Sequence, residues 1–191
     1  RDLQRRDLLP AIFFVFSRRG CEEEAGRVGR SLQLLSEEEE TEARKTIRAW
    51  ALDNEAVASL DSEHERVQLL TRGVAAHHAG LLPQYKTLVE DLFKKGLVKA
   101  CLATETLAAG VNLPARTTII TSLKKRGDDG IEPLTTAGLL QMAGRAGRRG
   151  KDKAGTVLVM RGHRNGAGDA DLARRILLNK VAPISSHFAP S

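Results

Sequence analysis

The sequence predicts an α/β fold in which a parallel sheet is flanked by helices. Short apolar runs of strand length recur along the 191 residues, at 11–16, 74–78, 99–103, 117–121 and 156–160. These runs are apolar at consecutive positions, which is typical of strands covered on both faces. Segments with helical patterning alternate with the runs, and this alternation favours a layered fold with right-handed crossovers.

The predicted helices lie at 20–35, 37–52, 62–72, 84–95, 135–149 and 169–179. The charged stretch between the first two strands is long, and it indicates one helix followed by a helical insert at about 36–72. Ser36 is the expected N-cap of the first insert helix, because a serine oxygen can accept a free N–H group of the first turn. The four glutamates that follow it suit the positive end of the helix dipole.

A β-hairpin is predicted at 122–134, between the fourth and fifth apolar runs. A basic arm comes first, then a Gly-Asp-Asp-Gly turn and a short apolar arm. In open parallel sheets, ligands bind beyond the carboxyl ends of the strands. Functional residues are therefore expected just after each apolar run.

The composition excludes several classes of protein. No apolar run approaches the ~20 residues that a membrane-spanning helix needs. Cys21 and Cys101 are far apart and each lies beside apolar sequence, which favours buried thiols in a reducing compartment. No spacing of Cys and His suits a metal ion, so no metal site is expected. The formal net charge of +6 favours a polyanionic partner.

The ten residues QMAGRAGRRG, at 141–150, combine three arginines with three glycines. On a helix that starts at Thr135 or Thr136 and ends before Gly150, three side chains would share one face. These are Gln141, Arg145 and Arg148.

Glycines inside such a helix cost about 1 kcal/mol each relative to alanine. The pattern therefore favours a ligand that approaches the helix backbone closely. A guanidinium group matches phosphate oxygens, and at a γ-phosphate it can stabilise the transferring group. The alternative at this point is a basic, glycine-rich segment that binds nucleic acid without specificity.

A second polar string, ATETLAAGVNLPA at 103–115, follows the third apolar run directly. Thr104 and Thr106 offer hydroxyl and N–H groups that suit a phosphodiester oxygen. Gly110 permits a close approach of the backbone, and Asn112 supplies an amide. A capped strand-to-helix turn would explain the threonines but not the whole string. No G-x-x-x-x-G-K-[ST] loop occurs in the sequence.

Four strings in this order resemble the second RecA-like domain of Ski2-like DExH-box RNA helicases of superfamily 2: FFVFSRRGCEE, GVAAHHAGLLP, ATETLAAGVNLPAR and QMAGRAGRRG. The first, third and fourth match the family's motifs IV, V and VI. The resemblance runs from about Leu9 to Phe188, and the plant chloroplast members are the most similar in character. It implies a linker at 1–9, a helicase C-terminal domain at 10–180 and a connection to a winged-helix domain at 181–191.

The resemblance implies a nucleotide site shared with a first RecA-like domain, which would hold most of the ATP and its Mg²⁺. The residues of this chain that it places at the nucleotide are Gly110, Asn112, Gln141, Arg145 and Arg148. Among these, Gln141, Arg145 and Arg148 are the expected catalytic residues, with Arg148 the first choice for an arginine finger.

The resemblance also implies contacts with RNA, either single-stranded or partly duplex. The expected contacts with the RNA backbone are Ser17, Arg18, His78, Gly80, Thr104 and Thr106. The hairpin would act as a wedge between strands, with phosphate contacts from Lys124, Lys125 and Arg126.

The function implied is that of the C-terminal half of an ATP-dependent RNA helicase, inactive as an ATPase by itself. Its expected partners are RNA, the first RecA-like domain and the downstream winged-helix domain, with no membrane. The expected location is intracellular, in the chloroplast, nucleus or cytoplasm. The alternatives are a non-catalytic nucleic-acid-binding module and a DNA helicase of the same group.

Overall fold

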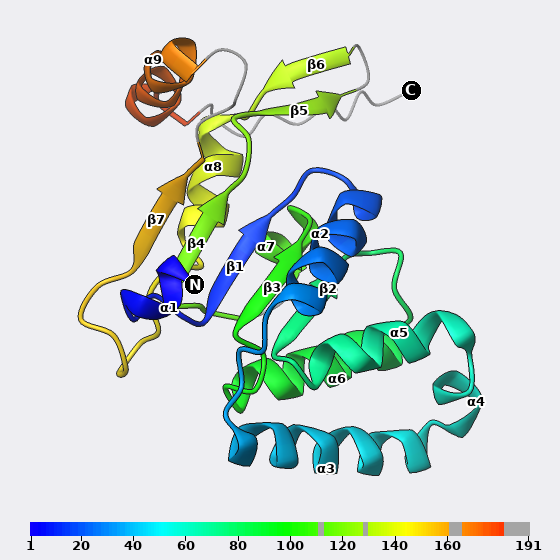
Figure 1. Ribbon diagram of the computed structural model, residues 1–191. Helices are drawn as coiled ribbons and strands as arrows, with labels where there is room; N and C mark the ends of the chain where they lie inside the picture. The colour runs from blue at the N-terminus through cyan, green and yellow to red at the C-terminus, as the bar shows by residue number, and fades with distance from the viewer. Residues whose placement is uncertain (111–112, 128–129, 161–165, 182–191) are drawn as a thin grey trace, which may run out of the picture.

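The α/β class is confirmed by a computed structural model that describes residues 1–110, 113–127, 130–160 and 166–181 (Figure 1). Five parallel strands form one sheet in the order β2-β3-β1-β4-β7. They are β1 (Ala11–Phe14), β2 (Val74–His77), β3 (Ala100–Ala103), β4 (Thr117–Ile120) and β7 (Thr156–Val159). All five strands predicted from the apolar runs are present, each slightly shorter than its run.

Helices cover both faces of the central strands. On one face, α2 (Arg18–Ser31) packs Cys21 and Ala25 against a cluster that includes Val74 and Leu102. On the other face, α6 (Pro83–Lys94) and α8 (Thr136–Ala143) pack against alternate residues of the same strands, including Phe14. Because successive strand residues point to opposite faces, cover on both faces requires apolar residues at consecutive positions.

The edge strand β7 departs from the prediction of cover on both faces. Its apolar side chains remain partly exposed, at 41% for Val157, 37% for Leu158 and 39% for Val159. Within the described part of the chain, its one neighbour in the sheet is β4. A continuous apolar run therefore does not distinguish a central strand from an edge strand.

The charged stretch between β1 and β2 folds into α2 and three further helices, α3 (Glu37–Asp53), α4 (Glu55–Ala58) and α5 (Asp61–Leu70). The cap predicted at Ser36 is confirmed. Ser36 Oγ accepts the N–H of Glu39 at 3.2 Å, and the Glu39 carboxylate accepts the N–H of Ser36 at 3.1 Å. None of the helices in the described residues has the length and apolar character needed to cross a membrane.

The remaining elements include the predicted hairpin, formed by β5 (Lys124–Gly127) and β6 (Gly130–Pro133). The helix predicted at 169–179 is α9 (Gly166–Leu178). Two short helices, α1 (Asp2–Arg5) and α7 (Thr106–Gly110), were not predicted, and neither was α4. Each of these three spans little more than one helical turn, which is too short to show an amphipathic period.

The helix predicted to run through residue 149 is wrong, because α8 ends at Ala143. Its start is as predicted, since Thr135 Oγ1 accepts the N–H of Gly138 at 3.1 Å. Beyond the helix, Gly147 and Gly150 adopt positive φ angles of 91° and 76°, which glycine tolerates best. The chain therefore leaves the helix before it reaches Arg145 and Arg148.

Gly147 of this segment takes part in a backbone contact with two other parts of the chain, at Ala115 and at Gly155. Ala115 N–H donates to Arg145 O at 2.9 Å, and Gly147 N–H donates to Ala115 O at 2.7 Å. A Cβ atom added to Gly155 would lie 2.4 Å from the carbonyl carbon of Ala146. Backbone therefore packs on backbone here. This contact gives Gly147 a structural role, and the close approach of a ligand stays a prediction.

We expect Gly155→Ala to lower the free energy of unfolding by about 2 kcal/mol or more, because the new methyl group meets backbone that cannot rotate away. Gly96→Ala is the comparison, since Gly96 has φ 76° but no atom within 4 Å of an added Cβ. Its expected loss is about 1 kcal/mol, from backbone strain alone. Urea unfolding measures both, and an equal or smaller loss for Gly155→Ala would contradict the close contact.

Candidate functional site

The loops after β1, β2 and β3 and the arginine-rich segment lie at opposite edges of the sheet. Phe14, His77 and Ala103 are register partners in adjacent strands, so the carboxyl ends of β1, β2 and β3 lie level. The predicted RNA contacts follow these strands. The arginine-rich segment lies instead beside Ala115, before β4, and lines a cavity with Pro10, before β1. This segment therefore does not lie at the edge where functional residues were expected.

At the carboxyl edge, the residues that open α2 meet the loop after β2. Ser17 is the N-cap of α2, and its Oγ accepts the N–H of Gly20 at 3.0 Å. Arg18 is exposed, and its Cδ would lie 3.2 Å from a Cβ added to Gly80. The structure thus brings Arg18 and Gly80 together, and the missing side chain of Gly80 leaves room for the stem of Arg18.

His78 has its ring inside the protein, with the side chain 5% exposed. Its Nδ1 accepts the N–H of Gly80 at 3.2 Å, and its Nε2 lies 3.1 Å from Glu22 Oε1. Because Nδ1 acts as an acceptor, Nε2 carries the hydrogen and donates it to Glu22. Both ring nitrogens therefore shape the loop, and direct phosphate contact by His78 stays a prediction.

Glu22 is the carboxylate that this cluster shares. It also accepts hydrogen bonds from Arg66, whose Nη2 lies 2.8 Å from Glu22 Oε1. Burial raises the pKa of Glu22, but hydrogen bonds from His78 and Arg66 outweigh burial and bring the pKa to about 2. The charge of Glu22 is thus compensated beside a surface predicted to bind phosphate.

Thr104 and Thr106 form the next part of this edge. Their Oγ1 atoms are 2.8 Å apart, and Thr104 N–H donates to His77 O at 3.2 Å. Glu105 lies between them, and Lys125 Nζ contacts its two carboxylate oxygens at 3.0 and 3.1 Å. The two hydroxyls therefore lie together at the surface, and the acid between them is paired with a cation of the hairpin.

The three predicted phosphate contacts of the hairpin do not share one face. Lys124 and Arg126 are exposed, whereas the intervening Lys125 is half-buried and bound to Glu105. The register pairs Arg126 with Ile131, which places them on one face, and the Ile131 side chain is 81% exposed. The outer face thus presents two cations and an exposed apolar side chain.

From the other edge, the Arg145 side chain reaches α7, the helix that begins with Thr106. Its Nε donates to Ala108 O at 3.1 Å, and its Nη2 bonds the same oxygen. Gly110 ends α7, and Gln141 is exposed on α8. Asn112 lies outside the described residues. Because α8 ends at Ala143, the prediction that Gln141, Arg145 and Arg148 share one helix face is wrong.

Arg148 lies at the rim of this edge and pairs with Asp152. Its Nε is 2.8 Å from Asp152 Oδ2 and its Nη2 is 2.8 Å from Oδ1. The Arg148 side chain is 24% exposed and that of Asp152 only 2%. Hydrogen bonds from Arg148 hold the pKa of Asp152 far below its usual range, so this carboxyl stays charged.

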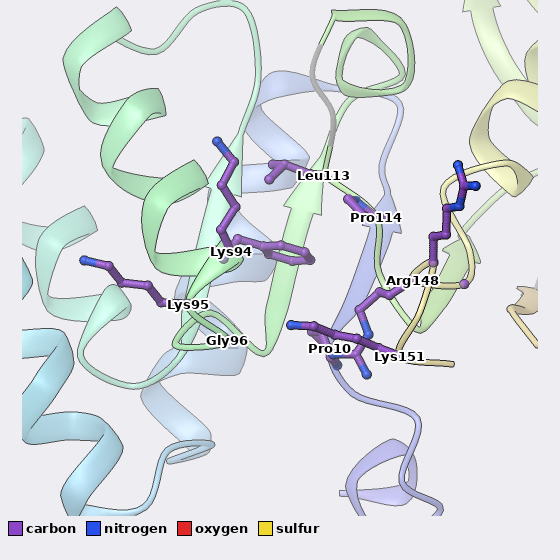
Figure 2. A pocket seen from close by; sticks show the side chains of 11 residues that line it. Pro10, Lys94, Lys95, Gly96, Leu113, Pro114, Arg148 and Lys151 are labelled. Atoms are coloured by element: carbon purple, nitrogen blue, oxygen red, sulfur yellow. The ribbon is translucent and has the colours of Figure 1, made fainter. Parts of the chain in front are cut away.

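A cavity of about 460 Å³ opens beside Arg148 (Figure 2). Lys94 and Lys95 come from the end of α6 on one side, and Arg148 and Lys151 come from the loop after α8 on the other. Arg149 also lines the cavity, whereas no carboxylate does among the described residues. The lining fits an anion such as a phosphate chain, and it offers no ligands for Mg²⁺.

Comparison with known proteins decides the family. Residues 31–150 match the helicase conserved C-terminal domain. This chain belongs to that family. The helicase C-terminal domain is the unit that the four sequence strings predicted, and the observed parallel sheet with flanking helices agrees with its RecA-like fold.

The relatives of this helicase domain are DExH-box and Ski2-like helicases. One is the DExH-box ATP-dependent RNA helicase DExH15, chloroplastic, of Arabidopsis thaliana, 44% identical over 99% of this chain and 16% of the relative. The antiviral helicase SKI2 of Saccharomyces cerevisiae is 42% identical over 83% of this chain and 12% of the relative. The probable helicase HelY of Mycobacterium tuberculosis is 44% identical over 99% of this chain and 21% of the relative. The chain therefore spans at most about a fifth of these relatives.

Several residues that lie at the two edges of the sheet or on the hairpin of the helicase domain were not identified from the sequence. Asp152 is an acid four residues after Arg148 in an otherwise basic run, and that spacing was the available signal. The other missed residues lie at the cavity or on the hairpin: Lys94, Lys95, Lys151 and Ile131. For these four, nothing in the local sequence indicates the surface that the fold gives them.

We expect Glu22→Gln to destabilise the protein by roughly 2–3 kcal/mol at pH 7, because Arg66 and His78 lose a charged partner. Since the folded state lowers the pKa of Glu22 from 4.5 to about 2, this stabilisation is complete above pH 4.5 and declines as the pH falls towards 2. Urea unfolding at pH 7 and pH 3 measures the difference from the wild type. If the stability difference between the wild type and Glu22→Gln is as large at pH 3 as at pH 7, the lowered pKa of Glu22 is wrong.

Proposed function

We propose that this helicase C-terminal domain is the second RecA-like half of an ATP-dependent RNA helicase. One observation carries the proposal. A single sheet presents a cationic cavity at one edge and, at the opposite edge, a polar surface built from the loops after β1, β2 and β3. A motor that holds a nucleotide and a polyanionic track at the same time needs two such surfaces.

At the cavity, the chain's own cations would hold the phosphate charge of ATP bound mainly by a preceding domain. Lys94, Arg149 and Lys151 form no ion pair within the described residues, so their charges are available to a ligand. Arg148 uses Nε and Nη2 on Asp152, and no hydrogen bond within the described residues involves its Nη1. That nitrogen is the group we assign to the γ-phosphate. When bound, ATP supplies the phosphoryl group, and Mg²⁺ would be held by the preceding domain.

At the carboxyl edge, Arg18, the loop at Gly80 and the paired hydroxyls of Thr104 and Thr106 would contact the RNA backbone. Contacts of this kind position a protein on its track without reading sequence. The two acids of this surface, Glu22 and Glu105, are each paired with a cation, which limits their repulsion of phosphate. The Arabidopsis relative is named an RNA helicase, which supports RNA as the track.

The hairpin would separate strands ahead of the motor. Its outer face combines the cations Lys124 and Arg126 with the exposed Ile131. Cations suit the phosphates of the displaced strand, and an apolar side chain can pack against an unstacked base. Lys125 contacts Glu105 instead, so we propose that Lys125 supports the hairpin while the outer face meets RNA.

We expect Arg148→Ala in the full-length protein to lower RNA-stimulated ATP hydrolysis by about a thousandfold, the size of an arginine-finger effect. RNA affinity should change less than twofold, because Arg148 lies at the other edge of the sheet. Lys153→Ala is the matched control, an exposed cation of the same loop that does not line the cavity. Loss of RNA affinity with unchanged hydrolysis would favour a non-catalytic binding module.

We expect Arg18→Gln to remove one phosphate contact, which lowers the steepness of log Kd against log salt by about 0.7 for single-stranded RNA. Arg19→Gln is the matched control, because Arg19 is exposed and pairs with Glu23 at 2.7 Å. Fluorescence anisotropy with a labelled oligonucleotide, over a series of salt concentrations, measures both slopes. Equal slopes for Arg18→Gln and wild type would exclude Arg18 as a phosphate contact. A matched DNA oligonucleotide tests the choice of track.

A further inference from the structure

Arg148 belongs to a chain of ion pairs that extends to the N-terminal segment. Asp152 accepts the Nε of Arg116 at 2.9 Å on Oδ1, the oxygen that also accepts Arg148 Nη2. Arg116 Nη1 in turn donates to the backbone oxygen of Asp7 at 2.6 Å, and it also contacts the Asp7 carboxylate. Four residues thus connect the segment before β1 to the rim of the cationic cavity.

The Asp152 carboxylate holds Arg148 by three bonds. Besides the two guanidinium contacts, Asp152 Oδ2 accepts the backbone N–H of Arg148 at 3.0 Å. A carboxylate that bonds Nε and Nη2 side by side fixes the plane of the guanidinium group. At 2% exposure, Asp152 is shielded from water that would otherwise compete for these bonds. The orientation of Nη1 is therefore set by a buried acid.

Asp7 has an unusual backbone conformation at the far end of this chain of pairs. Its φ of 55° makes it the one residue other than glycine with a positive φ in the described part of the protein. Such a conformation is costly for most residues and persists where neighbouring contacts maintain it. Here the contacts come from Arg116, which binds both the carbonyl and the carboxylate of Asp7.

From this geometry we propose that Asp152 is a positioning residue for Arg148, and that Arg116 links it to the conformation of the N-terminal segment at Asp7. The proposal rests on the function proposed above, in which Arg148 faces the nucleotide. A change in the path of the segment before β1 would move Arg116, then the shared carboxylate, and then the guanidinium group. Arg148 would be correctly oriented only when that segment takes the path seen here.

The experiment measures kcat and KM for RNA-stimulated ATP hydrolysis in the full-length protein. We expect Asp152→Asn to lower kcat by about a hundredfold, with KM changed less than threefold, because a small misplacement of a catalytic group costs about that much. Asp7→Asn should lower kcat about two- to fivefold, as expected for an exposed ion pair. Asp2→Asn is the matched control, an exposed acid of the same segment that pairs with Arg5 and Arg6, and it should leave kcat unchanged.

A double-mutant cycle separates positioning from a general effect on the fold. If Asp152 acts through Arg148, then Asp152→Asn should have no further effect on kcat in the Arg148→Ala background. The Asp7 side chain is 87% exposed, so Asp7→Asn keeps the test available should Asp152→Asn fail to fold. Thermal melting of each variant identifies such a failure.

The outcomes distinguish the two proposals. If Arg148→Ala abolishes hydrolysis but a folded Asp152→Asn protein keeps its kcat, the positioning role of Asp152 is wrong and the proposed function stands. Additive losses in the double variant would also overturn that role. If Asp7→Asn behaves like Asp2→Asn, the link to the N-terminal segment is wrong. If Arg148→Ala itself leaves hydrolysis unchanged, both the arginine finger and its positioning fail.

Discussion

The contact on which the position of the arginine-rich segment depends is the packing of backbone on backbone after α8. Ala146 and Gly147 lie against Ala115 on one side and Gly155 on the other, with no side chain between them. This contact ends the helix, turns the chain and brings Arg148 to the side of the sheet where β1 and β4 begin. A bulkier residue at either glycine would push the arginine-rich segment away from the cavity that it lines.

A second constraint is the placement of acids among cations. Glu22, Glu105 and Asp152 each lie within a surface that is otherwise suited to an anion, and each is bound by at least one cationic side chain. The acids orient those side chains and reduce the net repulsion between cations in the free protein. In the proposed function, this arrangement keeps the basic surface ordered before a polyanion binds, which lowers the entropic cost of binding.

The strands could be predicted from sequence because five apolar runs have few alternative explanations, and the cap at Ser36 follows from local chemistry alone. The end of α8 could not, because Gln141, Met142, Ala143 and Ala146 all favour helix and the positive φ of Gly147 depends on a distant partner, Gly155. The four quoted strings carry the family resemblance, which the match to the helicase conserved C-terminal domain confirms. They did not show that Arg148 lies at the opposite edge from Thr104, since that depends on where the loop after α8 packs.

Side-chain partners were the least accessible from sequence. His78 and Lys125 were expected to contact RNA because the family resemblance places the loop after the second strand and the hairpin at the RNA. In the fold, His78 contacts Glu22 and Lys125 contacts Glu105. Neither carboxylate is close to its partner in the sequence. Pairs between residues far apart in the sequence depend on how the helices and strands pack. No local sequence pattern encodes that packing.

The partly exposed strand β7 has a consequence for how the domain behaves in solution. An unprotected edge of a sheet offers its backbone groups to a strand from another molecule, and apolar side chains on that edge strengthen such pairing. Lys151 and Lys153 lie just before β7, and both are exposed. If the β7 edges of two copies approached each other, the lysines of one copy would repel those of the other. The same lysines that make the loop basic therefore oppose aggregation through this edge.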